Sequence, residues 1–145
     1  MPRKVRDAEV RRCLEKVGLE PFGDSLPREI SGGMKQRVAL ARVLILRPKV
    51  LLMDEPFGAL DALTRGEMQG LFLSLMRDTR GTSLFVTHDV EEAVTLADRL
   101  LVMGSSPGRI RVDIPVPLPR PRVRSDDGFV RLCREVRELL GAETA

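Results

Sequence analysis

The sequence predicts an α/β fold in which short buried strands alternate with helices. Residues 50–53 form an unbroken apolar run, which is typical of a strand buried on both faces of a parallel sheet. A helical pattern over residues 62–78 follows it, and further strand-like runs cover residues 83–87 and 100–103. This alternation from residue 49 onward predicts helices layered on a mostly parallel sheet.

Two helices are expected before the first strand. Apolar residues recur at helical spacing over residues 7–17, and Gly18 follows as a helix stop. Residues 19–30 hold two prolines and a glycine, so we expect a loop there. A second helix is predicted over residues 31–46.

The elements after the second strand follow the same reasoning. A capping box opens a predicted helix over residues 89–98, and a turn is expected at residues 104–108. Residues 110–114 alternate as an exposed or edge strand does. The four prolines of residues 115–124 predict an extended connector, and a last helix is expected over residues 125–140.

Composition limits the classes of protein that fit. The 145 residues are 43% apolar and 31% charged, as in a globular domain with a core. No apolar run approaches the roughly 18 residues of a membrane span, and the N-terminus does not resemble a secretory signal.

Cys13 and Cys133 fit no metal-ligand spacing and are expected to be reduced thiols of a cytosolic chain. The net charge of +3 is scattered and Trp and Tyr are absent, so no nucleic-acid partner is expected.

An acidic pair, Asp54 and Glu55, follows the run at residues 50–53. The carboxyl ends of strands in open α/β sheets are where ligands bind. One carboxylate there suits Mg²⁺, usually held through water, and the other suits a base that activates water. An Asp-Glu turn that merely caps the next segment explains the same residues.

A glycine pair, Gly32 and Gly33, follows Ser31 at the start of the second helix. Glycines let the backbone approach a ligand closely, and a helix N-terminus favours an anion such as phosphate. A flexible helix cap is the alternative interpretation.

Two further residues are candidates for the same chemistry. His88, the one histidine of the chain, follows a predicted strand and is placed to contact a terminal phosphate or the attacking water. A histidine of a loop beside a helix cap is the alternative. Asp61 is a weaker candidate, since it also suits the start of the following helix.

The order and spacing of these motifs resemble the ATP-binding cassette family. In this resemblance, ISGGMKQRVALAR is the signature motif, VLLMDEP the Walker B strand, GALD the D-loop and VTHD the switch histidine. The stretches RLLVMGSSPGRI and VPLPRPR are similar to the branch that imports nitrate, sulfonates and taurine. Met34 stands where many members have Gln.

The resemblance implies a role for each candidate residue. Asp54 would coordinate Mg²⁺ through water, Glu55 would be the general base, and His88 would contact the γ-phosphate of ATP. Ser31, with Gly32 and Gly33, would hold the γ-phosphate of an ATP bound to a second subunit. Asp61 would couple the two sites.

The resemblance also implies partners and a location. Two nucleotide-binding subunits of the family sandwich two ATP molecules head to tail, and ATP hydrolysis moves attached membrane permease subunits. The chain would therefore be cytoplasmic and peripheral on the inner face of the membrane. The transported solute would be a small anion.

The chain departs from the family pattern in one respect that bears on its activity. The family's phosphate-binding loop needs a lysine between a glycine and a Ser or Thr, and none of the lysines here has those neighbours. The family's upstream glutamine and adenine-stacking aromatic also have no counterpart.

The expected organisation follows from those gaps. Residues 1–46 would be the remnant of the family's helical subdomain with the signature motif, residues 47–114 the rear half of a RecA-like, P-loop NTPase core, and residues 115–145 a connector and C-terminal helix. The chain would serve either as a partial ATPase subunit or as a catalytically idle fragment that supplies its signature motif to a complete partner.

Overall fold

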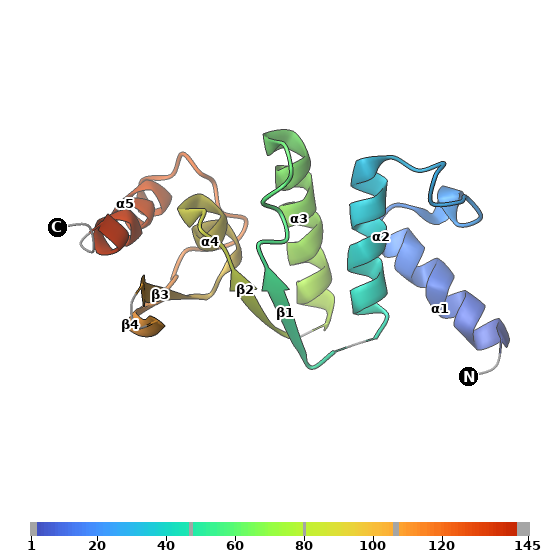
Figure 1. The fold of residues 1–145 in the computed structure, drawn as a ribbon, viewed down its shortest axis with the longest axis horizontal. Coiled ribbons are helices and arrows are strands. Elements are labelled where there is room, and N and C mark those ends of the chain that lie inside the picture. Colours follow the sequence, from blue (N-terminus) through green and yellow to red (C-terminus); the bar gives the residue numbers. More distant parts are fainter. Residues whose placement is uncertain (1–2, 47, 80, 106–107, 142–145) are drawn as a thin grey trace. The chain divides into compact units, whose positions relative to one another are not determined.

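The computed structural model describes residues 3–46, 48–79, 81–105 and 108–141 (Figure 1). The chain divides into two compact units. The first comprises Met1–Leu52 and Pro56–Leu84, and the second comprises Met53–Glu55 and Phe85–Ala145. Helices and strands alternate from β1 to α4, which confirms the predicted α/β class.

The first unit contains three helices, α1 (Arg3–Lys16), α2 (Gly32–Leu44) and α3 (Ala62–Thr79), and a short 3-10 helix, η1 (Glu20–Phe22). Helix α1 begins four residues earlier than its apolar spacing predicts. Its first turn is mostly polar and buries no side chain, so the apolar spacing could not detect it. It ends before Gly18, whose φ of 68° is a conformation that favours glycine. The predicted end of the second helix at Arg47-Pro48 lies partly outside the described residues.

One arginine links the three helices of the first unit. Nη1 of Arg37, on α2, donates to the backbone oxygen of Val17 after α1 at 3.4 Å. Nη2 of the same side chain donates to Glu67 of α3 at 3.0 Å. The apolar core of the unit lies around these helices and β1, and its buried members include Val17, Leu19, Leu40, Ala41, Leu51, Phe57, Leu60, Met68, Phe72 and Leu75.

Strands β1 (Val50–Asp54) and β2 (Thr82–Val86) pair with each other in a two-stranded sheet. The amide of Thr82 donates to the backbone oxygen of Lys49 at the start of both strands, and the amide of Glu55 donates to Val86 at their ends. Starts paired with starts and ends with ends make the pair parallel. The predicted strand over residues 83–87 is thus observed one residue earlier.

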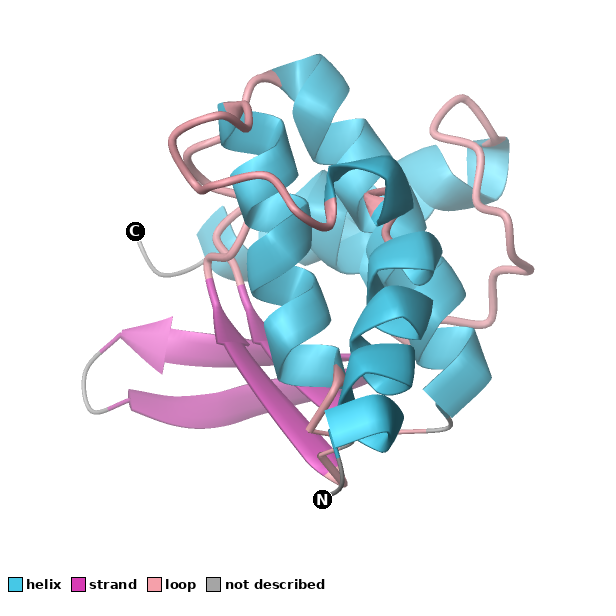
Figure 2. Ribbon diagram, turned by 90° about the vertical axis from the view of Figure 1, so that its right-hand side faces the viewer, coloured by secondary structure: helices cyan, strands magenta, loops and turns pink. Residues whose placement is uncertain are grey.

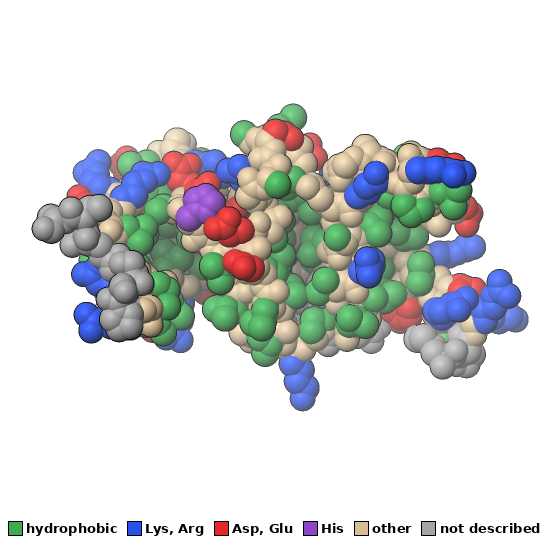
Figure 3. Space-filling view, in the orientation of Figure 1, with side chains coloured by type: hydrophobic (Ala, Val, Ile, Leu, Met, Phe, Trp, Pro, Cys, Tyr) green, Lys and Arg blue, Asp and Glu red, His purple; other side chains and the backbone are tan. Residues whose placement is uncertain are grey.

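One face of this parallel pair is apolar and exposed (Figure 3). The side chains of Val50 and Leu52 on β1 are 55% and 71% exposed, and Leu84 on β2 is 50% exposed. Leu51, whose side chain points to the opposite face, is 7% exposed. Parallel sheets in proteins are ordinarily covered on both faces, so this face differs from the buried strand that the sequence predicts.

The second unit contains helix α4 (Val90–Leu96), strands β3 (Arg99–Ser105) and β4 (Gly108–Pro115), and helix α5 (Asp127–Gly141). Strands β3 and β4 form an antiparallel hairpin (Figure 2). Its register shifts between Val102 and Met103. The turn predicted at residues 104–108 is wrong for its described residues, because Gly104 and Ser105 pair within β3 and Gly108 begins β4. Residues 106 and 107 of that turn lie outside the described residues. Helix α4 ends at Leu96, before the predicted end at residue 98, because Ala97 is extended.

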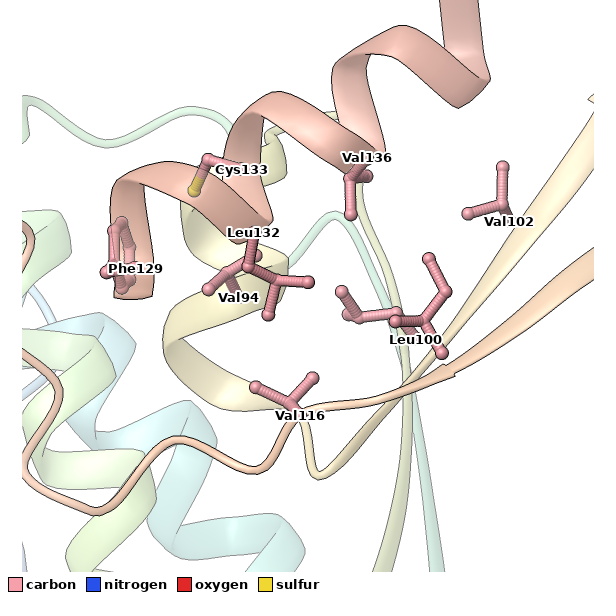
Figure 4. Close-up of a cluster of buried hydrophobic side chains, with 9 residues drawn as sticks. Val94, Leu100, Val102, Val116, Phe129, Leu132, Cys133 and Val136 are labelled. Carbon is pink, nitrogen blue, oxygen red and sulfur yellow. The ribbon is translucent and has the colours of Figure 1, made fainter. Parts of the chain in front are cut away.

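The hairpin and the two helices of this unit share a hydrophobic core (Figure 4). Val94 of α4 is fully buried at its centre. The other buried members come from the hairpin, the residue after it and α5: Leu100, Val102, Ile114, Val116, Phe129, Leu132, Cys133 and Val136. In the described part of the chain, no helix has the length and apolarity that crossing a membrane requires.

Candidate functional site

The ends of β1 and β2 bring the predicted acidic pair and the predicted histidine to one edge of the sheet. β1 ends at Asp54 and is followed by Glu55, while β2 ends at Val86, two residues before His88. Because the strands are parallel, their carboxyl ends meet at the same edge. The hydrogen bond from the Glu55 amide to the Val86 oxygen, 2.9 Å long, fixes this meeting point.

Glu55 has an unusual backbone conformation, with a φ of 42°. A residue before a proline is ordinarily extended, and Pro56 follows, so the sequence gives no reason to expect this conformation. Left-handed non-glycine residues carry strain of about 1–3 kcal/mol and are enriched at functional sites. This backbone conformation turns the chain away from the strand direction immediately after β1.

Glu55 and His88 are in direct contact. Nδ1 of His88 lies 2.8 Å from Oε1 of Glu55. Figure 3 shows the histidine against acidic side chains on the surface, and the two side chains are 77% and 50% exposed. This contact engages one ring nitrogen with the carboxylate and leaves Nε2 as the other polar atom of the ring.

The contact changes the protonation of the histidine. The hydrogen bond that the ring makes to the carboxylate of Glu55, together with the negative charge of that carboxylate, raises the pKa of His88 above its ordinary value of 6.5. Asp89 and Glu92 add smaller effects in the same direction, and the partial loss of water around the ring opposes them. A larger share of His88 is therefore protonated near neutral pH than for a free histidine.

The loop that carries His88 is held by its neighbours. The amide of Asp89 donates to Oγ1 of Thr87 at 3.1 Å. The carboxylate of Asp89 accepts from the amides of Glu91 and Glu92 and thereby caps α4, as the sequence predicts. His88 thus lies between a strand end and a capped helix start.

Asp54 is the one residue of the predicted metal site. Its side chain is exposed at the end of β1, and the described residues contain no cluster of three or more groups able to hold a metal ion. Mg²⁺ often takes only one or two protein carboxylates and completes its shell with water and phosphate oxygens. Asp54, with Glu55 as the one adjacent carboxylate, fits that mode and does not fit an all-protein cage.

Ser31 lies in the first unit, at the start of α2. It is the N-cap of that helix, and its Oγ accepts from the amide of Met34 at 3.2 Å. The hydroxyl proton is not used by this bond. The helix cap, which is the alternative interpretation of this motif, is therefore present. The hydroxyl group of Ser31 can still donate a hydrogen bond to a ligand.

Gly32 and Gly33 form the first turn of α2. Neither has a positive φ, so their backbone conformation does not require glycine. A Cβ atom on Gly32 would meet nothing within 4 Å, and one on Gly33 would lie 3.9 Å from Cγ2 of Thr64, an ordinary contact. Within this chain, neither conformation nor packing explains these two glycines.

Asp61 is the N-cap of α3. Its Oδ1 accepts from the amides of Leu63 and Thr64 at 3.1 and 3.0 Å. Hydrogen bonds from Thr64, side chain and backbone, lower the pKa of Asp61 despite the small desolvation that opposes them. The structure thus gives Asp61 the helix-start role that the sequence allows.

The structure brings Glu55 and His88 into contact at the strand edge where β1 ends at Asp54, all within the second unit. Ser31, Gly32, Gly33 and Asp61 belong to the first unit. Sequence reasoning missed the strained backbone of Glu55 and the contacts of Arg122, a residue of the Pro-rich connector. The repeated Arg-Pro pairs of that connector are the only sequence signal that sets it apart from a plain linker.

Comparison with known proteins gives one family and a consistent set of relatives. The ABC transporter family matches residues 3–58. An aliphatic sulfonates import ATP-binding protein of Bacillus cereus is 45% identical over 132 residues, which are 91% of this chain and 52% of the relative. A taurine import ATP-binding protein of Roseobacter denitrificans is 50% identical over 86% of this chain and 47% of the relative. The chain spans about half the length of these relatives.

Solved structures show the same fold. The cbiO1 protein of Clostridium perfringens, described as part of the ABC transporter complex cbiONQ, matches with a TM-score of 0.74 and 27% identity. The match covers 98% of this chain and 51% of that protein. An inward-facing ABC transporter of metal-chelate type matches at a TM-score of 0.69 and 22% identity, over 80% of this chain and 45% of its own.

Proposed function

We propose that the chain is part of an ATPase that energises the import of a small anion such as nitrate, a sulfonate or taurine. The similarity to ATP-binding proteins for the import of sulfonates and taurine supports this proposal. The observation that carries the proposal is the 2.8 Å contact between Glu55 and His88 at the carboxyl edge of β1 and β2. A carboxylate and an imidazole at such an edge suit hydrolysis of the phosphoanhydride bond between the β- and γ-phosphates of ATP.

In this proposal Glu55 is the general base. Its carboxylate accepts a proton from a water molecule while the water oxygen attacks the γ-phosphorus of ATP. The bond between that phosphorus and the bridging oxygen breaks, and ADP leaves with the electron pair. The backbone bond to Val86 holds the base in register with the neighbouring strand.

His88 would contact the γ-phosphate from the ring nitrogen that Glu55 does not engage. The raised pKa of His88 keeps more of the ring protonated, and a protonated ring donates from both nitrogens. Asp54 would hold Mg²⁺ through water. The ion, when bound, neutralises charge that develops on the phosphate oxygens.

The signature residues would act on an ATP held by a second nucleotide-binding subunit. The open space around Gly32 and Gly33 supports this role, because glycine leaves room for a phosphate to approach the helix amides. Ser31 adds its hydroxyl, and Asp61 would lie at the contact between the two subunits. Membrane permease subunits would be the further partners, so the protein would be peripheral on the cytoplasmic face.

A second candidate function follows from the same sequence. No lysine in the chain lies between a glycine and a Ser or Thr, which the phosphate-binding loop requires. The chain would then be a catalytically idle module that lends Ser31, Gly32 and Gly33 to a complete partner.

Two assays of phosphate release separate these functions. In the first, the chain is mixed with a complete relative whose own signature serine is replaced, so that the relative alone is inactive. Release that appears on mixing, and that Ser31→Asp abolishes, supports the signature role. In the second, the chain is co-expressed with the segment of a relative that carries the phosphate-binding loop.

The second assay tests hydrolysis by this chain's own site. Release that Glu55→Gln and His88→Ala abolish, and that the exposed control Asp126→Asn leaves intact, supports the ATPase proposal. Ser31-dependent release in the first assay without Glu55-dependent release in the second supports the idle module. Failure of both assays overturns both functions.

A further inference from the structure

Arg122 is a buried arginine bound to the end of helix α4. Its side chain is 2% exposed. Nη1 donates to the backbone oxygens of Val94 and Ala97 at 2.7 and 2.6 Å, and also to Thr95 at 3.2 Å. The guanidinium thus binds three carbonyl groups at one helix terminus.

The same guanidinium also binds the connector from which it projects. Nη2 donates to the oxygen of Val116 at 3.3 Å, and Nε donates to the oxygen of Leu118 at 3.3 Å. Val116 belongs to the core of the second unit. Arg122 therefore ties the end of α4 to a part of the chain that is itself fixed by packing.

A second arginine of the connector binds the same helix terminus. Nη2 of Arg120 donates to the oxygen of Leu96 at 2.6 Å and to the carboxylate of Asp98 at 2.8 Å. Arg120 is more exposed than Arg122, with 35% of its side chain open to solvent. The connector, predicted from its prolines as an extended spacer, is thus bound to α4 through both arginines.

The two arginines bind a large share of the carbonyl groups in so short a helix. Helix α4 has seven residues, and the last four carbonyls of any helix have no partner within it. The C-terminus of a helix also carries partial negative charge, which a buried cation stabilises. Most of the orphan carbonyls of α4 are therefore satisfied by one or two arginine side chains.

The opposite end of α4 begins beside the candidate active site. Asp89 caps the helix, and His88 comes immediately before the cap. A seven-residue helix fixed at its C-terminus transmits that position to its N-terminus, because its backbone hydrogen bonds hold it as one body. The contact of His88 with Glu55 depends on where this N-terminus lies.

We propose that Arg122 is a positioning residue that holds helix α4 so that His88 stays against Glu55. Whether this positioning matters for catalysis rests on the proposed function. That Arg122 keeps His88 in contact with Glu55 can be tested without it. A purely structural arginine would stabilise the core of the second unit without affecting the histidine.

The single histidine of the chain makes the test direct. The ring protons of His88 are followed by NMR as the pH is raised, for wild type, Arg122→Gln and Arg122→Lys, with the exposed Arg131→Gln as the control. The groups that set this titration are Glu55, Asp89 and Glu92. In wild type and in the control, the midpoint lies above 6.5.

The expected result is a downward shift of the midpoint in Arg122→Gln, toward 6.5, because the ring loses its bond to Glu55. Arg122→Lys keeps the charge but lacks the planar fork, so it is expected to shift in the same direction. The sign is diagnostic, since removal of a positive charge by itself raises the pKa of a histidine. A folded Arg122→Gln whose histidine titrates as in wild type overturns the proposal.

Arg120→Gln covers the case in which Arg122→Gln does not fold. It removes contacts to the same helix terminus from a more exposed position, and a smaller downward shift is expected. An unchanged midpoint in a folded Arg120→Gln, with Arg122→Gln unfolded, counts against positioning and in favour of a core role. The titration uses no nucleotide, so its outcome is independent of whether phosphate release is observed.

Discussion

Nδ1 of His88 lies 2.8 Å from Oε1 of Glu55, although the residues are 33 positions apart in the chain. The contact exists because two parallel strands end at the same edge and the Glu55 amide is bonded to the strand that leads to the histidine. The stability that this pair contributes depends on pH, and the raised pKa of His88 gives the direction of the change.

The first prediction concerns stability against pH. Because the pKa of His88 is raised in the folded state, the contact contributes fully below the unfolded value near 6.5 and loses this contribution as pH rises through the higher folded value. The difference in unfolding free energy between wild type and His88→Gln, measured in urea at low salt, should therefore fall as the pH rises from about 6.5 through the raised pKa of the folded state.

Glu55→Gln is the matched control for this experiment. It removes the negative charge that raises the pKa, so a second difference, between Glu55→Gln and the double variant, should be nearly flat with pH. A wild-type difference that grows with pH contradicts the raised pKa.

The second prediction concerns Ser31 as a helix cap. Ser31→Ala removes the acceptor for the Met34 amide and should lower the free energy of unfolding by about 1 kcal/mol. Ser31→Asp keeps an acceptor and should be close to wild type in stability, yet its charge repels a phosphate. Equal stability of Ser31→Ala and wild type in chemical denaturation would show that the cap bond contributes little.

The third prediction concerns Gly32 and Gly33, the glycine pair in the first turn of α2. Gly32→Ala and Gly33→Ala should leave the chain as stable or raise its stability by up to about 1 kcal/mol, because alanine favours helix and meets no close atom here. In the mixing assay, the same variants should abolish phosphate release, because the added methyl groups occupy the phosphate approach. Gly66→Ala on α3, also in open space, is the control that should stabilise without affecting release. Strong destabilisation by Gly32→Ala would contradict the open surroundings.

The fourth prediction compares adjacent residues on opposite faces of β1. Leu51→Ala removes a buried side chain and should cost about 2–5 kcal/mol. Leu52→Glu changes a side chain that is 71% exposed and should alter the free energy of unfolding by no more than about 0.5 kcal/mol. Leu52→Glu should also lower the binding of an apolar dye and the tendency to self-associate, since it charges the open apolar face. An equal loss of stability in the two variants would mean that this face is covered.

The fifth prediction concerns the two free thiols. Cys133 is 2% exposed, and burial raises the pKa of its thiol, whereas Cys13 is partly exposed. An alkylating reagent at about pH 8 should therefore modify Cys13 in the native chain and Cys133 only after unfolding. Mass spectrometry of the digested protein reports both sites, and early labelling of Cys133 would argue against the packing of α5 on the hairpin.

Several features followed from the sequence by local rules. Apolar spacing located the helices and strands, glycine marked the end of α1, and Asp89 marked the start of α4. The order of the motifs indicates the ATP-binding cassette family, whose model also matches residues 3–58, because four short patterns in register are far more specific than any one of them.

The sequence did not predict that one face of the sheet formed by β1 and β2 is exposed. The run at residues 50–53 predicts a strand buried on both faces, and only the exposure of Leu52 and Leu84 shows which face is uncovered. An apolar pattern records what a strand is suited to pack against, whereas exposure depends on which other segments are present.

By itself, then, the sequence determined the fold class and most of the elements and supplied the candidate residues of the site, because each depends on neighbours within a few positions along the chain. Tertiary structure decided that Glu55 is strained and bonded to His88, and that Arg122 is buried against α4. These features depend on backbone groups brought together from distant positions by strand pairing and by the path of the connector. No local pattern distinguishes an arginine that binds such groups from one that is solvated.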